Sequence, residues 1–296
     1  IDPKLAFRYQ ASNNVALRAS FSTSFREPSL AQLSSSNVSL QGIQDYNADG
    51  SAKGGTAFIR IAQKNNPNLA PEESENMNIG LMWNPTDQLA VKVDYWAIDY
   101  TNVITIESAQ GIVAANPSDP AVKRTAGGTL TGVTTSYFNA ANVNTSGLDF
   151  EATYDFDSTL GQVQIGVNAM HMFEYEIPLG GTTKDVVGLF NHDNFARSLP
   201  ETKAVFHAAL DSGNNSLSLF GRYTSDYSTT RPLDANAKAR GFSQSIDSFF
   251  TVDLIDSYIV EMKDSELKLS VGITNLFDEE VPMVFDAANW SYDSKH

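Results

Sequence analysis

Apolar and polar residues alternate along much of this chain with a period of two, as in strands whose two faces meet different surroundings. The segment 148–156 reads LDFEATYDF, so its acidic residues lie on one face and its aromatic residues on the other. The same division recurs in 5–9, 15–25, 77–83, 89–95, 217–223 and 267–274. Helical periodicity is not sustained beyond a couple of turns, so the pattern predicts an all-β chain. A face that carries several carboxylates does not fit a dry core between two sheets.

The connections between these segments alternate between short and long. Short connections, rich in Asn, Asp, Gly, Pro and Ser, are expected at about 11–14, 84–88, 157–161, 211–215 and 261–265. Long connections are expected at about 27–70, 108–132, 176–201, 228–245 and from 279 onward. This alternation is typical of an antiparallel meander across an outer membrane, with short periplasmic turns and long extracellular loops. The predicted strands lie at about 4–10, 15–26, 72–83, 89–106, 133–156, 161–175, 202–210, 216–227, 247–259 and 266–275.

Composition narrows the class of protein without naming it. The chain has 296 residues, and no apolar run approaches the length of about eighteen that a spanning helix needs, which argues against a helical membrane protein. The formal net charge of −15 argues against nucleic acid as a partner, because phosphate contacts need clustered Lys and Arg. There is no cysteine, so neither a disulfide framework nor a thiolate metal site is available.

Four segments carry motifs that occur in a known order. They read SFREPSL at 24–30, NLAPEES at 68–74, YFN at 137–139 followed by TSGLDFE at 145–151, and GITNLFD at 272–278. Together they resemble the carboxy-terminal part of the β-barrel of TonB-dependent outer-membrane receptors. The resemblance implies an antiparallel transmembrane β-barrel of 22 strands, of which this chain supplies about ten.

The resemblance also implies an organisation and a function. Residues 1–296 are expected to form the C-terminal part of the barrel, with the plug domain, the first half of the barrel, the last strand and the TonB box lying elsewhere; any export signal is expected upstream of Ile1. The expected function is TonB-energised uptake of a scarce solute, foremost an iron–siderophore complex, across the outer membrane of a Gram-negative bacterium. Oligosaccharide, peptide and cobalamin uptake stay open. The expected partners are outer-membrane lipid, the receptor's own plug domain, the TonB–ExbB–ExbD complex and a small-molecule ligand, and no cofactor is needed.

Two groups of candidate site residues follow. Charged residues on the polar face are expected to face the lumen and the plug: Arg8, Arg18, Arg26, Lys92, Asp94, Asp149, Glu151, Arg222 and Lys268. Aromatic residues of the long loops are the candidates for ligand binding, although loop packing is the alternative for each: Tyr46, Phe58, Tyr227, Phe242 and Trp290.

Enzymatic and metal-binding alternatives find little support in the sequence. The four histidines fall in unrelated segments, and neither G-x-S-x-G nor H-E-x-x-H is present, so no enzyme is predicted. The segment Asp45–Ser51 resembles the opening of a calcium loop, but Thr56 stands where the bidentate Glu is required and Lys53 intervenes, so a polar loop tip is the simpler interpretation. A β-sandwich adhesin or carbohydrate-binding module, and a plug-free diffusion porin, are the structural alternatives.

Overall fold

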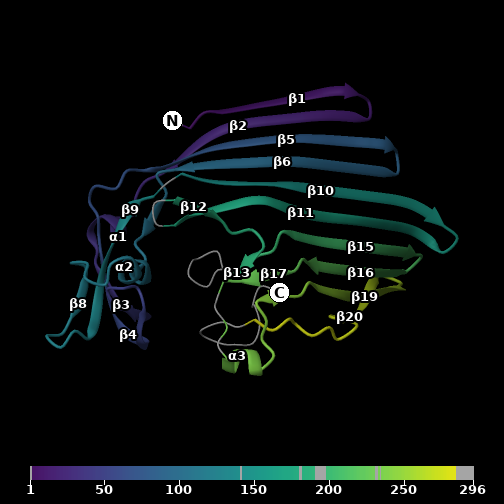
Figure 1. The fold of residues 1–296 in the computed structure, drawn as a ribbon. Coiled ribbons are helices and arrows are strands. Elements are labelled where there is room, and N and C mark those ends of the chain that lie inside the picture. The colour runs from purple at the N-terminus through teal and green to yellow at the C-terminus, as the bar shows by residue number, and fades with distance from the viewer. Residues whose placement is uncertain are drawn as a thin grey trace.

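The long strands form one antiparallel meander. The computed structural model describes residues 2–140, 142–179, 182–190, 198–230, 233 and 235–284. Its main sheet runs in the order β1-β2-β5-β6-β10-β11-β15-β16-β19-β20, with β12 added to β11. In Figure 1 these strands lie side by side from purple to yellow, joined by tight turns at one end and long excursions at the other. The strands are β1 (Lys4–Ser12), β2 (Val15–Arg26), β5 (Glu72–Thr86), β6 (Leu89–Thr101), β10 (Val143–Ser158), β11 (Gly161–Leu179), β12 (Thr182–Asp185), β15 (Thr202–Ser212), β16 (Asn215–Thr224), β19 (Phe249–Met262) and β20 (Ser265–Ile273).

Each of the ten predicted strands corresponds to one strand of this path, so the predicted all-β meander is confirmed. The tight turns between them use the expected chemistry: Gly161 and Gly213 lie at turns with φ of 139° and 59°, a region that glycine adopts without steric cost. The sheet curves but does not close within the described residues, because β1 and β20 each pair on one side only. The chain is therefore a section of barrel wall.

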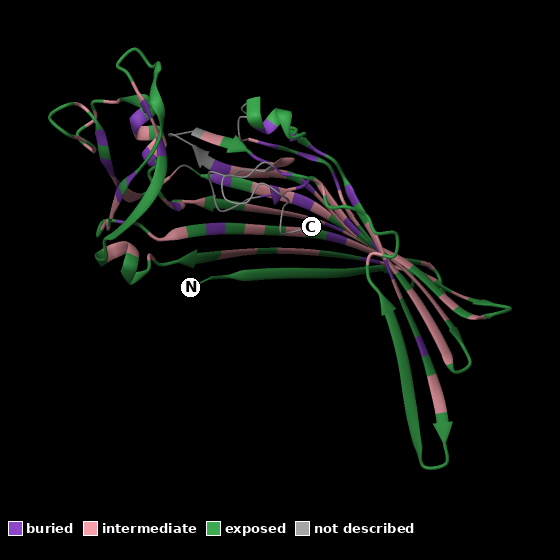
Figure 2. Cartoon of the chain, turned by 90° about the horizontal axis from the view of Figure 1, so that it is seen from below, coloured by how far each residue is buried: buried purple, intermediate pink, exposed green. Residues whose placement is uncertain are grey.

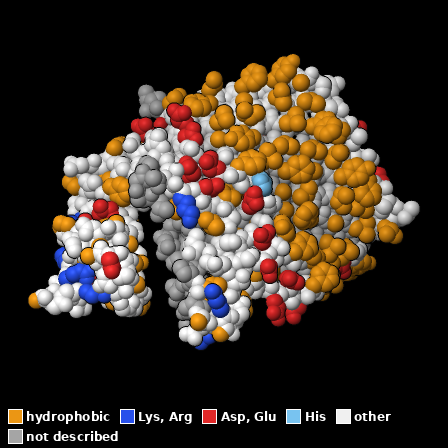
Figure 3. All heavy atoms as spheres, in the orientation of Figure 1, with side chains coloured by type: hydrophobic (Ala, Val, Ile, Leu, Met, Phe, Trp, Pro, Cys, Tyr) orange, Lys and Arg blue, Asp and Glu red, His pale blue; other side chains and the backbone are white. Residues whose placement is uncertain are grey.

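The convex face of this wall is apolar. Figure 3 shows hydrophobic side chains gathered over the outer surface of the long strands. Leu5 is 75% exposed and Val271 68% exposed, although both belong to regular strands. Large apolar side chains exposed in this density mark a surface that lipid covers in barrel proteins.

Two predicted strands prove to be wrong in their limits. The strand predicted at 89–106 ends as β6 at Thr101, because Asn102 adopts a left-handed φ of 55°, and the chain continues as β7 (Ile104–Ile106) in another sheet. The strand predicted at 133–156 is likewise divided, into β9 (Leu130–Asn139) and β10. The breaks, at 102–103 and 140–142, are short, and strand-forming residues lie on both sides of each one, which hides the change of sheet from the sequence pattern.

The two longest connections fold together as an outer lobe. This lobe contains a sheet in the order β3-β4-β9-β7, with β8 paired to β9, and a helix that packs on it. Its core comprises Ile43, Ile59, Ile61, Ala109, Val113, Leu130 and Val133. The elements are α1 (Leu30–Ser34), β3 (Asn37–Tyr46), β4 (Ala52–Lys64), α2 (Ala109–Ala115) and β8 (Val122–Arg124), with β7 and β9. In Figure 1 the outer lobe lies at the end of the sheet that carries the long connections.

A second, smaller lobe follows β11 along the chain. It consists of β13 (Leu189–Phe190), β14 (Ser198–Leu199), β17 (Tyr227–Thr229) and β18 (Ser245–Ile246), with the helix α3 (Ala235–Ala239) nearby in sequence. Tyr227, Ile246 and Val284 form its core. Figure 2 shows the barrel strands mostly exposed or half-buried, whereas buried residues gather in the outer lobe. No helix among the described residues is long and apolar enough to span a membrane.

Candidate functional site

The concave face of the wall carries the predicted charged residues in register. Residues paired directly across an antiparallel ladder share a face. One such row runs from Arg8 through Arg18, Gly80, Asp94 and Asp149 to Lys203 by way of Met170. The next row joins Lys92 and Glu151 to Arg222. Two further predicted residues, Arg26 in β2 and Lys268 in β20, have the same parity as their neighbours on this face.

Arg18 and Asp94 form an ion pair that crosses an intervening strand. Arg18 Nε donates to Asp94 Oδ1 at 2.8 Å, and a terminal nitrogen of Arg18 donates to the other carboxylate oxygen. Gly80 of β5 lies between them, and a Cβ there would stand 2.7 Å from Arg18 Nε and would also collide with the Asp94 carboxylate. The Asp94 side chain is only 11% exposed, so the charge of Arg18 compensates a largely buried carboxylate.

Two more ion pairs extend this network along the concave face. Lys92 Nζ donates to Glu151 Oε1 at 2.8 Å between directly paired residues. Arg222 pairs with Asp253, whose other oxygen accepts the backbone N–H of Asn275 at 2.9 Å. Asn275 begins the NLFD motif and has a left-handed φ of 52°, so this carboxylate fixes the turn that ends β20. The motif noted in the sequence therefore has a structural role in the wall.

Asp149 and Lys203 lie on the same face without a partner. Within the part of the chain that the structure describes, neither side chain forms a hydrogen bond or an ion pair. Asp149 lies directly opposite Asp94, a like charge. A cavity of about 750 Å³ is lined by Arg18, Lys92, Asp94, Asp149, Glu151, Lys203 and Arg222, among others. The concave wall thus presents uncommitted charges of both signs to the space inside it.

A smaller pocket of about 400 Å³ lies on the same face, nearer the long connections. The Arg26–Glu72 ion pair is on its wall, and Glu72 Oε1 also accepts the backbone N–H of Ile104 at 2.7 Å. Two tyrosines, Tyr100 and Tyr175, line it. These two tyrosines were not among the predicted site residues. Tyr100 has the same parity as Asp94 in its strand, so an aromatic residue on the charged face was a usable signal. We name this cavity the rim pocket. Its other lining residues are Ser24, Phe25, Glu73, Ser74, Val103, Ile104, Thr105, Val143, Asn144, Thr145, Glu176 and Ile177.

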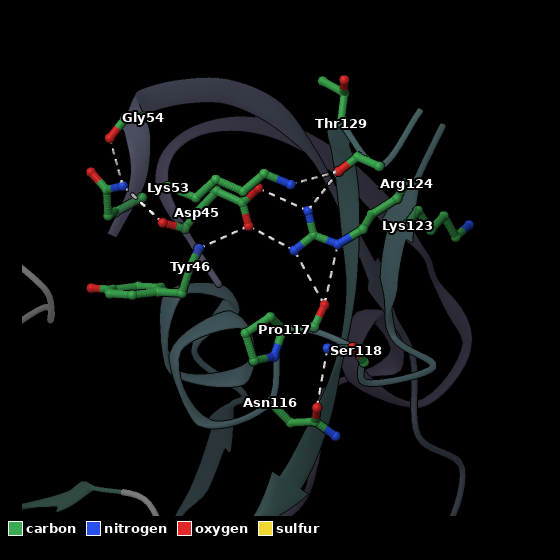
Figure 4. A network of polar contacts seen from close by, with 12 residues as sticks. Asp45, Tyr46, Lys53, Gly54, Asn116, Pro117, Ser118, Lys123, Arg124 and Thr129 are labelled. Carbon is green, nitrogen blue, oxygen red and sulfur yellow. Dashed lines mark hydrogen bonds and ion pairs between the residues drawn. The ribbon is translucent and has the colours of Figure 1, made fainter. Parts of the chain in front are cut away.

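The outer lobe is stabilised by an ion pair between Asp45 of β3 and Arg124 of β8. Arg124 Nη1 and Nη2 donate to the two carboxylate oxygens at 2.8 and 2.6 Å, while the remaining N–H groups reach the carbonyls of Pro117 and Gly128 (Figure 4). All five donors of the guanidinium are therefore used. The Arg124 guanidinium, assisted by the backbone N–H of Tyr46, holds the pKa of the Asp45 carboxyl below its ordinary value.

The Asp45–Arg124 ion pair argues against a calcium site in the segment Asp45–Ser51. Asp45 would supply the first calcium ligand, yet both its oxygens already bind Arg124, and it is 7% exposed. Asp49 accepts hydrogen bonds from the backbone and side chain of Ser51 at 2.9 and 2.6 Å, as in an ordinary polar turn. The geometry supports a turn rather than a cation site, and the described residues contain no group of three or more acidic or histidine side chains arranged for a metal.

The predicted aromatic ligand residues are placed in different surroundings. Phe58 is 81% exposed on the outer lobe, and Tyr46 is half-buried against that lobe's core. Tyr227 is 2% exposed and Phe242 7% exposed, which favours loop packing for these two. Trp290 lies outside the described residues. Of the four described residues, Tyr46 and Phe58 belong to the outer lobe, whereas Tyr227 and Phe242 are buried elsewhere.

Comparison with known proteins identifies the architecture. The sequence profile of the family described as TonB dependent receptor-like, beta-barrel, matches residues 1–276. The chain resembles a ferric enterobactin receptor mutant from Pseudomonas aeruginosa in complex with enterobactin, with a TM-score of 0.64 and 17% identity over 95% of this chain and 35% of that chain. It also resembles the siderophore receptor PirA from Acinetobacter baumannii, with a TM-score of 0.61 and 15% identity over 94% of this chain and 37% of that one.

A third similar structure is the copper transporter OprC, with a TM-score of 0.54 and 15% identity over 93% of this chain and 33% of that chain. At these identities the likeness concerns the fold. The chain spans about a third of the length of each of these structures. No curated protein sequence matches it.

Proposed function

The chain belongs to the family of TonB-dependent receptor-like β-barrels, and we propose that it forms part of the wall of an outer-membrane receptor for a ferric siderophore. In this proposal the receptor lies in the outer membrane of a Gram-negative bacterium, and its apolar convex face contacts lipid. A plug domain supplied by the rest of the receptor fills the concave side, and the TonB–ExbB–ExbD complex provides the energy. The protein transports its ligand and does not transform it, so no cofactor is required.

The observation that carries the proposal is the contrast between the two faces of one sheet. The convex face exposes large apolar side chains, whereas the concave face holds four ion pairs and, within the described residues, leaves Asp149 and Lys203 unpaired. A wall around bulk water would solvate such charges individually. Uncommitted charges among fixed ion pairs instead fit a folded partner inside the barrel, which is the place of a plug.

The siderophore part of the proposal draws on the similar structures, two of which are siderophore receptors by description. It is tested by deleting the gene and measuring uptake of radiolabelled iron supplied on a panel of catecholate, hydroxamate and carboxylate chelates under iron limitation. We expect uptake of one class to fall at least tenfold and to be restored by the wild-type gene. Uptake that is unchanged in the deletion strain, or that persists without TonB, would contradict the proposal.

A further inference from the structure

The rim pocket contains hydrogen-bond donors that nothing in the described chain satisfies. Arg26 Nε donates to Glu72, and the Arg26 side chain is 65% exposed, so its two terminal nitrogens are available as donors. The hydroxyl groups of Tyr100 and Tyr175 likewise have no hydrogen bond within the described residues. These donors belong to three different strands that converge on one cavity.

Of the three carboxylates that line the rim pocket, Glu72 and Glu176 are engaged, whereas Glu73 is exposed at the opposite parity, paired with Phe25 in the ladder. Glu72 binds Arg26 through one oxygen and the N–H of Ile104 through the other. Glu176, at the edge of the pocket, accepts from the backbone N–H of Asn144 at 2.9 Å and from Thr183 Oγ1 at 2.8 Å. The hydroxyls of Ser24 and Ser74 bond to each other at 2.7 Å. A ligand that enters this pocket therefore meets free donors and few free acceptors.

Val103, Ile104 and Ile177 add apolar wall beside the two tyrosine rings, and polar residues such as Thr105, Asn144 and Thr145 line the rest. A volume of about 400 Å³ is in the range of cavities that hold small organic groups. The free edge of a guanidinium matches the two oxygens of a carboxylate, and tyrosine rings provide flat apolar surface for the group that bears it.

From this arrangement we propose that the rim pocket binds a carboxylate-bearing planar organic group. Arg26 pairs with the carboxylate, and Tyr100 and Tyr175 lie beside its frame and donate to the carboxylate oxygens through their hydroxyl groups. Glu72 is a positioning residue, since it holds Nε of Arg26 and so turns the terminal nitrogens into the cavity. The proposal deepens the receptor function proposed above, on which its biological meaning rests. It assigns one arm of the transported solute to a named site on the barrel wall.

The test uses the full-length gene product that contains this chain, purified in detergent, with fluorine NMR line broadening of three aromatic probes of similar size. Fluorobenzoate, fluorobenzamide and fluorobenzylamine carry a negative, a neutral and a positive substituent on the same ring. We expect broadening by the benzoate alone, about tenfold weaker binding in Arg26→Gln, and unchanged binding in Arg60→Gln. Arg60 is an exposed arginine of the outer lobe and lies outside the rim pocket, so it controls for loss of one positive charge.

Three results would overturn the proposal: equal broadening by the amine, equal binding in Arg26→Gln and wild type, or equal loss in Arg60→Gln. If Arg26→Gln fails to fold, the double variant Tyr100→Phe with Tyr175→Phe decides, since it keeps both rings and removes only the hydroxyl groups. Weaker benzoate binding is expected there, and unchanged binding would reject the site. Because the assay needs no TonB and no iron, its failure is separate from a failure of siderophore uptake.

Discussion

Arg18 of β2 and Asp94 of β6 are joined over the top of β5, with Gly80 beneath the bond. Side chains alone form this link between two strands that are not neighbours in the sheet. The bond depends on the missing side chain of Gly80, because a Cβ would occupy the space of both partners. The Arg18–Asp94 ion pair therefore requires glycine at position 80.

Gly80→Ala should break this link. The added methyl group must displace Arg18 or Asp94, and Asp94 is then left as a largely buried, uncompensated carboxylate, so we expect a loss of about 2 kcal/mol in unfolding free energy. Thermal denaturation of the full-length receptor in detergent measures the change. Gly272→Ala is the matched control, since it also lies inside a strand but its Cβ would meet only a backbone oxygen at 4.0 Å. Equal effects of both substitutions would refute this role for Gly80.

The outer lobe should lose stability in acid through Asp45. Its pKa is lowered in the folded lobe, so the Asp45–Arg124 pair contributes fully above the unfolded value of about 3.9 and is lost as pH falls through the lower folded pKa. The protection factors of the amides in β3 and β8 should therefore fall only below about pH 4. Asp45→Asn should show fast exchange already at neutral pH, equivalent to about 2 kcal/mol, and a weaker dependence on acid.

Asp49→Asn serves as the control for this experiment. It removes a carboxylate from the same hairpin, but one that is fully exposed and bonded only to Ser51. The lobe of this variant should keep slow exchange at neutral pH and the acid-dependent step. If Asp49→Asn and Asp45→Asn behave alike, the Asp45–Arg124 pair does not stabilise the lobe as described.

The barrel wall was predictable from the sequence because its rules are local. Each wall strand meets lipid on one face and charged side chains on the other, so every strand carries the alternation, as in 148–156. Tight turns then fix which strands pair as hairpins, and the hairpins lie in the sheet in their order along the chain. The charged face was predictable for the same reason, since parity alone places Arg18, Asp94 and Glu151 on one side.

The lobes and the rim pocket were not predictable in this way. The parallel pairing of β4 with β9 joins residues about seventy positions apart, and no local pattern encodes it. The hairpin of β3 and β4 lies within a segment that was predicted as a long connection. The residues of β4 nevertheless alternate between buried Ile59 and Ile61 and exposed Arg60. The rim pocket depends on where strands end relative to one another, which parity does not give. Tyr227 was predicted as a ligand-binding loop aromatic, but it is buried in the second lobe.

Asn139 should hold the outer lobe to the barrel. Its side-chain nitrogen donates to the carbonyls of Ala70 and Asn102 at 2.9 and 2.8 Å, and its oxygen accepts the N–H of Ala70 at 2.9 Å. It thereby connects the chain entering β5, the chain leaving β6 and the end of β9. Asn139→Leu should cost about 2 kcal/mol and accelerate hydrogen exchange at 102–106, because three hydrogen bonds are lost at once. Asn37→Leu is the control, because it loses only a hydrogen bond to the adjacent backbone, and it should leave exchange at 102–106 unchanged. Equal acceleration in both variants would show that Asn139 does not hold the outer lobe to the barrel.

Asp253 has two separable functions, and variants at this position should distinguish them. Its pairing with Arg222 needs the negative charge, whereas its bond to the N–H of Asn275 needs only an acceptor oxygen, which asparagine retains. Asp253→Asn should therefore resemble Arg222→Gln, each costing about 1 kcal/mol, since the Arg222 side chain is 55% exposed and the pair is partly screened. Asp253→Ala should cost about a further 1 kcal/mol and also release the turn at Asn275, whose left-handed backbone then lacks its fixed partner.

Thermal unfolding of the three variants, with hydrogen exchange at 275–279, provides both measurements. If Asp253→Asn exchanges as fast at the turn as Asp253→Ala does, the carboxylate acts through its charge alone, and the NLFD turn is held by its own hydrogen bonds between Asn275 and Glu279.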